Sequence, residues 1–124
     1  MARLFILLGS LSGFLAVVLG AFGAHALRGR LSPELNAVYH TAEQYQFFHS
    51  LALLAIGLLA LHLPTSGALR WAGWSMVAGV VLFSGSLYAL AITGVRALGI
   101  ITPFGGTAFI VGWILLAVAA ARGL

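Results

Sequence analysis

Three polar side chains lie just before a long apolar run and are the sharpest candidates for chemistry. Glu43, Gln46 and His49 fall within one short stretch, and the run LALLAIGLL begins two residues later. A carboxylate close to hydrocarbon is costly and usually faces a bundle interior with a partner. One hypothesis therefore makes this cluster a ligand-binding or proton-handling site. The alternative, which we favour, makes Glu43 an interfacial anchor. Its expected partners are the arginines of the same membrane surface: Arg28, Arg30 and Arg96.

The histidines could serve as metal or haem ligands. His25, His40 and His49 fall toward one membrane face, where Glu43 could join them, whereas His62 lies at the other. A di-iron bundle needs four glutamates, and this chain has two acidic residues. His25 and His49 could hold haem if they lie at equal depth. Because histidines near an interface more often satisfy a carbonyl or water, we predict no cofactor and keep His25, His40 and His49 as weak metal candidates.

A second informative stretch is TPFGG, Thr102–Gly106. Thr102 can cap a helix with Pro103 in its first turn, and Gly105 and Gly106 let another backbone come close. Free N–H groups at such a start can bind an anion or a ligand carbonyl, although an ordinary capped start is the favoured interpretation. This start and Glu43 are expected on the same side of the membrane, so a single site would lie there. The hypothetical ligand-binding residues are Glu43, Gln46, His49, Tyr88, Thr102, Gly105 and Gly106.

No motif for enzyme chemistry is found. The chain contains neither cysteine nor aspartate, and it lacks both a Gly-x-Ser-x-Gly elbow and a Gly-rich phosphate loop. We therefore predict that the protein is not an enzyme.

Composition places the chain in a membrane. Of its 124 residues, 62% are hydrophobic and 6% charged, whereas a soluble domain carries about 25% charged residues. The six basic residues are single arginines at the ends of apolar runs, which is typical of interface anchors. They form no cluster that could bind nucleic acid. Membrane lipids are thus the expected partners, with a homo-oligomer or other membrane proteins as further options.

Four apolar spans must position these residues. A crossing helix needs ~20 apolar residues, and short loops force neighbouring helices antiparallel. We expect an all-α, four-transmembrane-helix antiparallel bundle that forms one domain, residues 1–124. Ser32 and Pro33 predict the start of an amphipathic helix, which either lies in the interface or runs directly into the second span. The expected ranges are 4–27, 46–63, 69–93 and 103–121 for the spans and 33–45 for the amphipathic helix.

Small residues predict tight packing of these helices, because close backbone approach favours association in lipid. In the third span, Ser84 and Tyr88 share a face while Ser86 faces away, and their hydroxyls are expected to bond across helices. The packing candidates are Gly9, Gly13, Ala16, Gly20, Ala24 and Ser84. At ~100° per residue, one face of the second helix carries Tyr39, Glu43, Gln46, Ser50 and Gly57.

Orientation is weakly specified, because three arginines fall on each side of the membrane. The N-terminal amine favours cytoplasmic termini. A transporter ranks last among the functional hypotheses, since the central turns of all four spans read as apolar or small.

Four segments resemble a known family: LGAFGAHAL, YQFFHSLALL, LFSGSLYALAITG and TPFGGTAFIVGW. Together they are similar to the YgdD-like family of small bacterial inner-membrane proteins (domain of unknown function 423, transmembrane protein 256-like). They span nearly the whole chain in the expected order. The resemblance implies four membrane helices in a multi-pass protein of the bacterial inner (plasma) membrane, and it supplies no reaction, substrate or cofactor.

The leading hypothesis is a non-enzymatic structural, assembly or lipid-interacting membrane module. The alternative is a membrane-embedded protein that binds a ligand, metal or haem near His25, Glu43, His49 and Thr102–Gly106.

Overall fold

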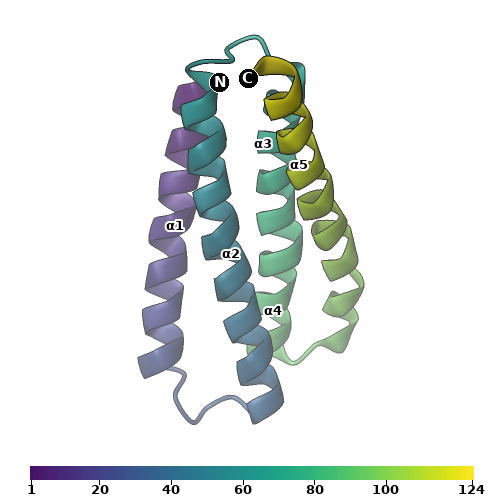
Figure 1. The fold of residues 1–124 in the computed structure, drawn as a ribbon. Helices are drawn as coiled ribbons and strands as arrows, with labels where there is room; N and C mark the ends of the chain where they lie inside the picture. Colours follow the sequence, from purple (N-terminus) through teal and green to yellow (C-terminus); the bar gives the residue numbers. More distant parts are fainter.

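The computed structural model describes residues 1–124 and contains helices only. Figure 1 shows them as long rods lying side by side, with both chain ends at the same end of the bundle. The first two rods are α1 (Ala2–His25) and α2 (Pro33–Ala60). The third consists of α3 (Gly67–Gly79), a π-helical turn η1 (Val80–Ser84) and α4 (Gly85–Thr93). A 3-10 turn η2 (Arg96–Ile100) leads into the last, α5 (Thr102–Gly123).

The rods pack as two pairs, and α2 connects one pair to the other. α1 lies against α2, and α3 lies against α5, while α2 also contacts α3 and α4. Successive rods run in opposite directions (Figure 1), as short connections require. The predicted all-helical antiparallel arrangement is therefore confirmed.

Three helical segments are long and apolar enough to cross a membrane: Ala2–His25, Gly67–Thr93 and Arg96–Gly123. The expected second span, 46–63, is not among them. The reason is that Glu43, Gln44, Gln46 and His49 interrupt the apolar sequence of α2.

The start of α2 is built as predicted. Ser32 is the N-cap, and its Oγ accepts a hydrogen bond from the N–H of Leu35 at 3.2 Å, with Pro33 in the first turn. From there α2 continues without a break to Ala60, so the amphipathic segment and the apolar segment that follows it form one continuous helix. The helix stops three residues before the expected Leu63, and α1 likewise ends at His25 rather than Leu27.

The third rod contains a feature that the sequence did not predict. The π-helical turn Val80–Ser84 interrupts the α-helix near its middle, and such turns frequently mark functional sites. The rod starts at Gly67, where Ser66 Oγ caps the N–H of Leu69 at 3.1 Å. It ends at Thr93, because Gly94 adopts φ 72°, a left-handed conformation that ends helices and favours glycine.

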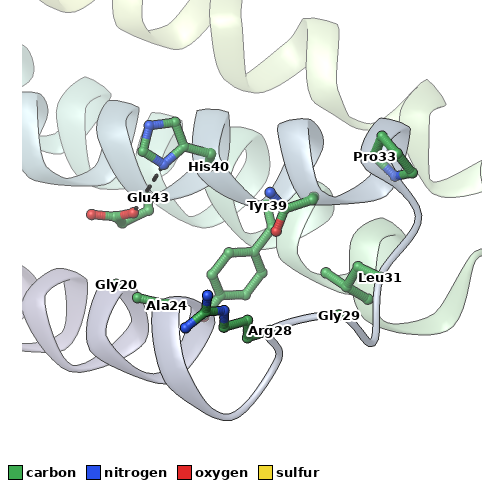
Figure 2. Close-up of a pocket in the computed structure, with 11 residues that line it drawn as sticks. Gly20, Ala24, Arg28, Gly29, Leu31, Pro33, Tyr39, His40 and Glu43 are labelled. Atoms are coloured by element: carbon green, nitrogen blue, oxygen red, sulfur yellow. Dashed lines mark ion pairs between the residues drawn. The ribbon is translucent and has the colours of Figure 1, made fainter.

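The connection between α1 and α2, residues 26–32, contains Arg28, Gly29 and Leu31 (Figure 2). Gly29 has φ 73°, which a side chain would disfavour, so the chain can turn back tightly toward α2.

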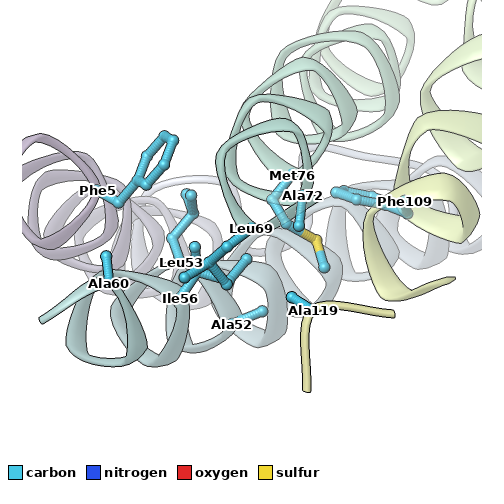
Figure 3. Close-up of a cluster of buried hydrophobic side chains, with 10 residues drawn as sticks. All are labelled: Phe5, Ala52, Leu53, Ile56, Ala60, Leu69, Ala72, Met76, Phe109 and Ala119. Carbon is cyan, nitrogen blue, oxygen red and sulfur yellow. The ribbon is translucent and has the colours of Figure 1, made fainter. Parts of the chain in front are cut away.

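The apolar core occupies the half of the bundle nearest the chain ends (Figure 3). Phe5 of α1 packs on Gly73 of α3, and Leu53 and Ile56 of α2 lie beside Met76 of α3. Large apolar side chains such as Phe14, Trp71 and Ile110 are exposed on the outside, as expected for a surface that faces lipid. The other half of the interior is polar and aromatic, and it contains the residues that could do chemistry.

Candidate functional site

A polar network crosses the interior of the bundle and is centred on Gln46. The Gln46 side chain is 5% exposed. Its Nε2 donates to the Ser12 carbonyl oxygen at 3.1 Å, and its Oε1 accepts from the Tyr88 hydroxyl at 2.6 Å. One amide therefore joins α1, α2 and α4, and each polar end of it is satisfied.

Ser50 extends this network toward α1. Its Oγ donates to the Gln46 carbonyl oxygen at 2.6 Å and lies 2.7 Å from Ser12 Oγ. Ser12 is near the middle of α1, so the network lies near the middle of the bundle. At this depth the inward face of α2 therefore carries polar residues that bond to neighbouring helices, whereas the centre of the expected span 46–63, near residues 53–56, is apolar as predicted.

His49 lies on another face of α2, against α5. Its ring stacks on Phe109, with 3.5 Å between ring centroids. The Nδ1–H donates to the Tyr45 carbonyl oxygen at 2.7 Å, and Trp113 Nε1–H donates to Nε2 at 3.1 Å. Since Nε2 must accept, this geometry requires the neutral tautomer with its proton on Nδ1.

The histidines do not assemble into a metal or haem site. Both nitrogens of His49 are already engaged, and the ring lies near the middle of the bundle while His25 ends α1. The proposed axial pair is thus at different depths. His40 contacts Glu43 alone, and no group of three or more His, Cys, Asp or Glu side chains that could hold a metal ion is present.

An aromatic groove of about 530 Å³ lies between α2, the π-helical turn and α5, beside His49. Its wall contains Tyr45, Phe83, Phe109 and Trp113. Tyr45 and Phe83 lie 4.6 Å apart by ring centroid, which joins α2 to the π-helical turn. Gly106 also lines this groove, so the groove contains two of the predicted ligand-binding residues, His49 and Gly106.

Glu43 faces α1 instead. A Cβ atom at Gly20 would lie only 2.7 Å from Glu43 Oε1, so the glycine makes room for the carboxylate. The carboxylate lies 3.4 Å from His40 Nδ1, and its side chain is 27% exposed. The expected pairing of Glu43 with Arg28, Arg30 or Arg96 is wrong: none of these arginines forms an ion pair with it.

The partner of Arg96 is Glu34, an acidic residue in the first turn of α2. Arg96 Nη1 and Nη2 donate to the two Glu34 oxygens at 2.7 and 3.3 Å. This forked hydrogen bond, followed by the charge of Arg96, lowers the pKa of Glu34 below its ordinary value. The exposed pair links the start of α2 to the η2 turn.

The residues expected to form one site therefore separate into two. Glu43 lines a cavity between α1 and α2, shown in Figure 2, whereas His49 and Gly106 line the aromatic groove on α5. Gln46 and Tyr88 lie between the two, with Gln46 buried and Tyr88 half-buried.

Thr102 does not cap α5, contrary to expectation. Backbone N–H groups at this helix start already have backbone partners: Ile101 N–H donates to Leu98 O, and Phe104 N–H donates to Ile101 O. The Thr102 hydroxyl instead lies 2.6 Å from Ser86 Oγ of α4. Ser86 therefore faces α5, on a different side of α4 from Tyr88, which bonds to Gln46 of α2.

Gly105 and several of the predicted packing residues lie at close helix contacts, whereas the prediction is wrong for Gly13 and Ala24. A Cβ atom at Gly105 would lie 2.2 Å from the backbone N of Phe83, so α5 touches the π-helical turn there. At Gly9 it would lie 3.0 Å from Leu54 N, whereas at Gly13 it would have room, 3.8 Å from Ser50. Ala16 is buried and Ala24 is exposed. Ser84 is buried in the π-helical turn, and its Oγ has no hydrogen-bond partner.

Several residues of these sites escaped the sequence interpretation. Tyr45, Phe109 and Trp113 were not singled out as site residues, although Phe109 and Trp113 lie four positions apart and so share a face of α5. Arg28 was expected only as an ion-pair partner of Glu43; it forms no such pair, yet it lines the same cavity.

Comparison with known proteins finds relatives along the whole chain. The family model described as "Protein of unknown function (DUF423)" matches residues 19–106. The chain is 49% identical to the UPF0382 membrane protein YwdK of Bacillus subtilis, over 98% of this chain and 99% of that protein. It is 50% identical to a UPF0382 membrane protein of Staphylococcus aureus, over 94% of each chain. No solved structure matches.

Proposed function

Because the chain belongs to the DUF423 family of membrane proteins, whose function is unknown, we propose a role from its geometry: a non-enzymatic, lipid-interacting helical module that crosses the bacterial inner membrane four times. The observation that carries this proposal is the closed network around Gln46, whose amide is satisfied by Ser12 and Tyr88. Polar side chains arranged this way hold helices together in lipid and leave no free group for a reaction.

The fourth crossing is supported by the position of α2. It lies between α1 and the α3–α4 rod, both of which belong to segments apolar enough to span a membrane. Its polar residues Gln46 and His49 are 5% and 6% exposed, so the neighbouring helices shield them from lipid. From Phe47 to the end of the helix its exposed side chains, such as Phe48 and Leu51, are apolar, although Gln44 before them is exposed. A helix with a polar interior and an apolar exterior can cross within a bundle even where its own sequence is too polar alone.

A transport role is less well supported. Near the middle of the bundle the side-chain polar atoms of Ser12, Gln46, His49 and Ser50 bond to one another or to neighbouring helices. A path for a solute would need polar groups that are free to exchange partners. A metal or haem role is also less well supported, because both His49 nitrogens are engaged.

Single-cysteine labelling in inner-membrane vesicles tests the topology without background, since the chain has no cysteine. We expect a membrane-impermeant maleimide to reach Arg30→Cys and Ala97→Cys from one side, and Thr65→Cys and Leu124→Cys from the other. The N-terminal amine favours the second side as the cytoplasmic one. Labelling of positions 30 and 65 from the same side would show that α2 does not cross, and it would overturn the proposal.

A further inference from the structure

A polar cavity of about 590 Å³ lies where α1 and α2 approach their connection. Figure 2 shows its main side chains: Arg28 from the connection, Tyr39, His40 and Glu43 from α2, with Gly20 and Ala24 of α1 forming the opposite wall. Tyr39 is buried, and its hydroxyl donates to the Leu19 carbonyl oxygen, which holds the ring as a fixed floor between the helices.

Two opposite charges in this cavity lack strong partners. Arg28 forms no hydrogen bond or ion pair with the protein, and Figure 2 shows its guanidinium turned back from the connection toward Ala24 and the Tyr39 ring. Glu43 has only the 3.4 Å contact with His40. At the same end of the bundle, Glu34 and Arg96 satisfy each other with bonds of 2.7 and 3.3 Å. The cavity thus offers the guanidinium of Arg28, which can donate hydrogen bonds to an anion, and the carboxylate of Glu43, which can accept them from a hydroxyl or ammonium group.

A second hollow continues from the cavity toward the middle of the bundle. It is an apolar groove of about 400 Å³ lined by Ala16, Val17, Ala21 and Phe47, and it shares Gly20 and Glu43 with the cavity. Val17 is 61% exposed, so the groove opens on the surface that faces lipid. Glu43 therefore lies at the neck between a polar space and an apolar one.

The depths of Arg28 and Glu43 in the bundle set the order of chemical groups that a ligand of this cavity must have. Arg28 belongs to the connection beyond α1, whereas Gly20, which faces Glu43, lies five residues inside the end of that helix, ~7.5 Å along its axis. From the surface inward, the sites are an anion donor, a hydrogen-bond acceptor and a slot for one apolar chain. A monoacyl phospholipid has the matching sequence of groups: a phosphate, a free glycerol hydroxyl and a single acyl chain.

Resting on the proposed lipid-interacting function, we infer that the cavity and groove together bind a lysophospholipid, with its phosphate at Arg28, its free glycerol hydroxyl donating to Glu43 and its acyl chain along Val17 and Phe47. A diacyl phospholipid fits less well, because at the neck it presents an ester, which only accepts hydrogen bonds and is repelled by a carboxylate. A fatty acid fits less well because its own carboxylate would face Glu43.

Three lipids with one headgroup test this assignment: palmitoyl lysophosphatidylcholine, hexadecylphosphocholine, which lacks the glycerol hydroxyl, and dipalmitoyl phosphatidylcholine, which has an ester in its place. Binding to the full chain in dodecyl maltoside is measured by native mass spectrometry. We expect the lysophospholipid to bind about tenfold more tightly than either other lipid, the effect of one charge-assisted hydrogen bond. Soluble glycerophosphocholine, which lacks the chain, is expected not to compete.

Pairs of variants test whether Glu43 and Arg28 are the residues that give the lipid selectivity. Glu43→Ala should weaken binding of the lysophospholipid about tenfold and leave hexadecylphosphocholine unchanged, whereas Arg28→Gln should weaken both lipids alike. Glu34→Ala and Arg30→Gln, which remove the same charges outside the cavity, should leave both affinities unchanged. A melting curve of each variant in the same detergent confirms folding, and Glu43→Gln replaces Glu43→Ala if the latter does not fold.

Equal affinity for the lysophospholipid and hexadecylphosphocholine would overturn the inference, as would an equal loss in Glu43→Ala and Glu34→Ala. Effective competition by glycerophosphocholine would overturn the assignment of the groove to an acyl chain. These outcomes are independent of the cysteine labelling, so a bundle that crosses four times without lipid selectivity would be recognised as such.

Discussion

Gln46 shows how one residue can hold three helices. Its amide uses a donor and an acceptor on opposite sides, toward Ser12 of α1 and Tyr88 of α4. In lipid, no water is available to replace either partner once the bundle has formed. The residue that the sequence interpretation treated as part of a ligand site therefore has a sufficient structural role.

Replacing Gln46 by leucine should destabilise the bundle by about 1–3 kcal/mol, since two interhelical hydrogen bonds of about 0.6–1.7 kcal/mol each are lost. The free energy of unfolding can be measured by titration with sodium dodecyl sulfate in mixed micelles, followed by circular dichroism.

Ser84→Ala serves as the matched control for that measurement. It removes a buried hydroxyl that has no hydrogen-bond partner, so we expect unchanged or slightly raised stability. Equal losses in the two variants would show that burial, and not the hydrogen bonds of Gln46, explains the effect.

At the scale of elements, the close contact between the π-helical turn and α5 depends on a single glycine, Gly105. The turn at Val80–Ser84 brings the Phe83 backbone so close to α5 that a Cβ atom at Gly105 would lie 2.2 Å from Phe83 N. At the adjacent Gly106, a Cβ atom would meet Phe83 Cδ2 at 3.7 Å, an ordinary contact.

Gly105→Ala and Gly106→Ala should therefore differ sharply. The first forces the two rods apart and should cost about 1–3 kcal/mol, as overpacking does. The second should be neutral or stabilising by up to about 1 kcal/mol through helix propensity. Melting temperatures in one detergent compare the pair. Similar melting temperatures would mean that α5 can shift away from the turn at no cost.

At the scale of the whole molecule, the polar end of the bundle is joined across the chain by Glu34 and Arg96. The pair connects the start of α2 with the η2 turn, and both side chains are exposed. Its contribution should therefore be modest and screened by salt.

This ion pair predicts a dependence of stability on pH. Because Arg96 lowers the pKa of folded Glu34, the pair contributes stability above the unfolded value of about 4.3, and this is lost as pH falls through the folded value. Glu34→Gln should therefore melt below the unmodified protein at pH 7, and the difference in melting temperature should narrow as the pH falls below about 4. A difference that does not change with pH would assign it to packing.

Two of the local predictions came from patterns that depend on sequence alone. Ser32 caps α2 as expected, because a cap needs only the hydroxyl and the N–H three residues later. The face with Tyr39, Glu43, Gln46, Ser50 and Gly57 does meet α1, since the helical period sets directions around one axis. The same period places Glu43 and His49 about 120° apart around the axis of α2, which the expectation of a single site overlooked.

The sequence by itself determined that this chain is a helical membrane protein, where its four rods begin and end to within three residues, and which residues of α2 share a face. These depend on composition and on neighbours a few positions apart. Only the tertiary structure decided which neighbouring helix each face of a helix contacts. It pairs Arg96 with Glu34 rather than Glu43, gives both His49 nitrogens partners, turns Thr102 toward Ser86 and leaves Arg28 facing Glu43 across a cavity. Each is a contact between residues far apart in the chain, and local periodicity carries no information about which distant residue will be adjacent.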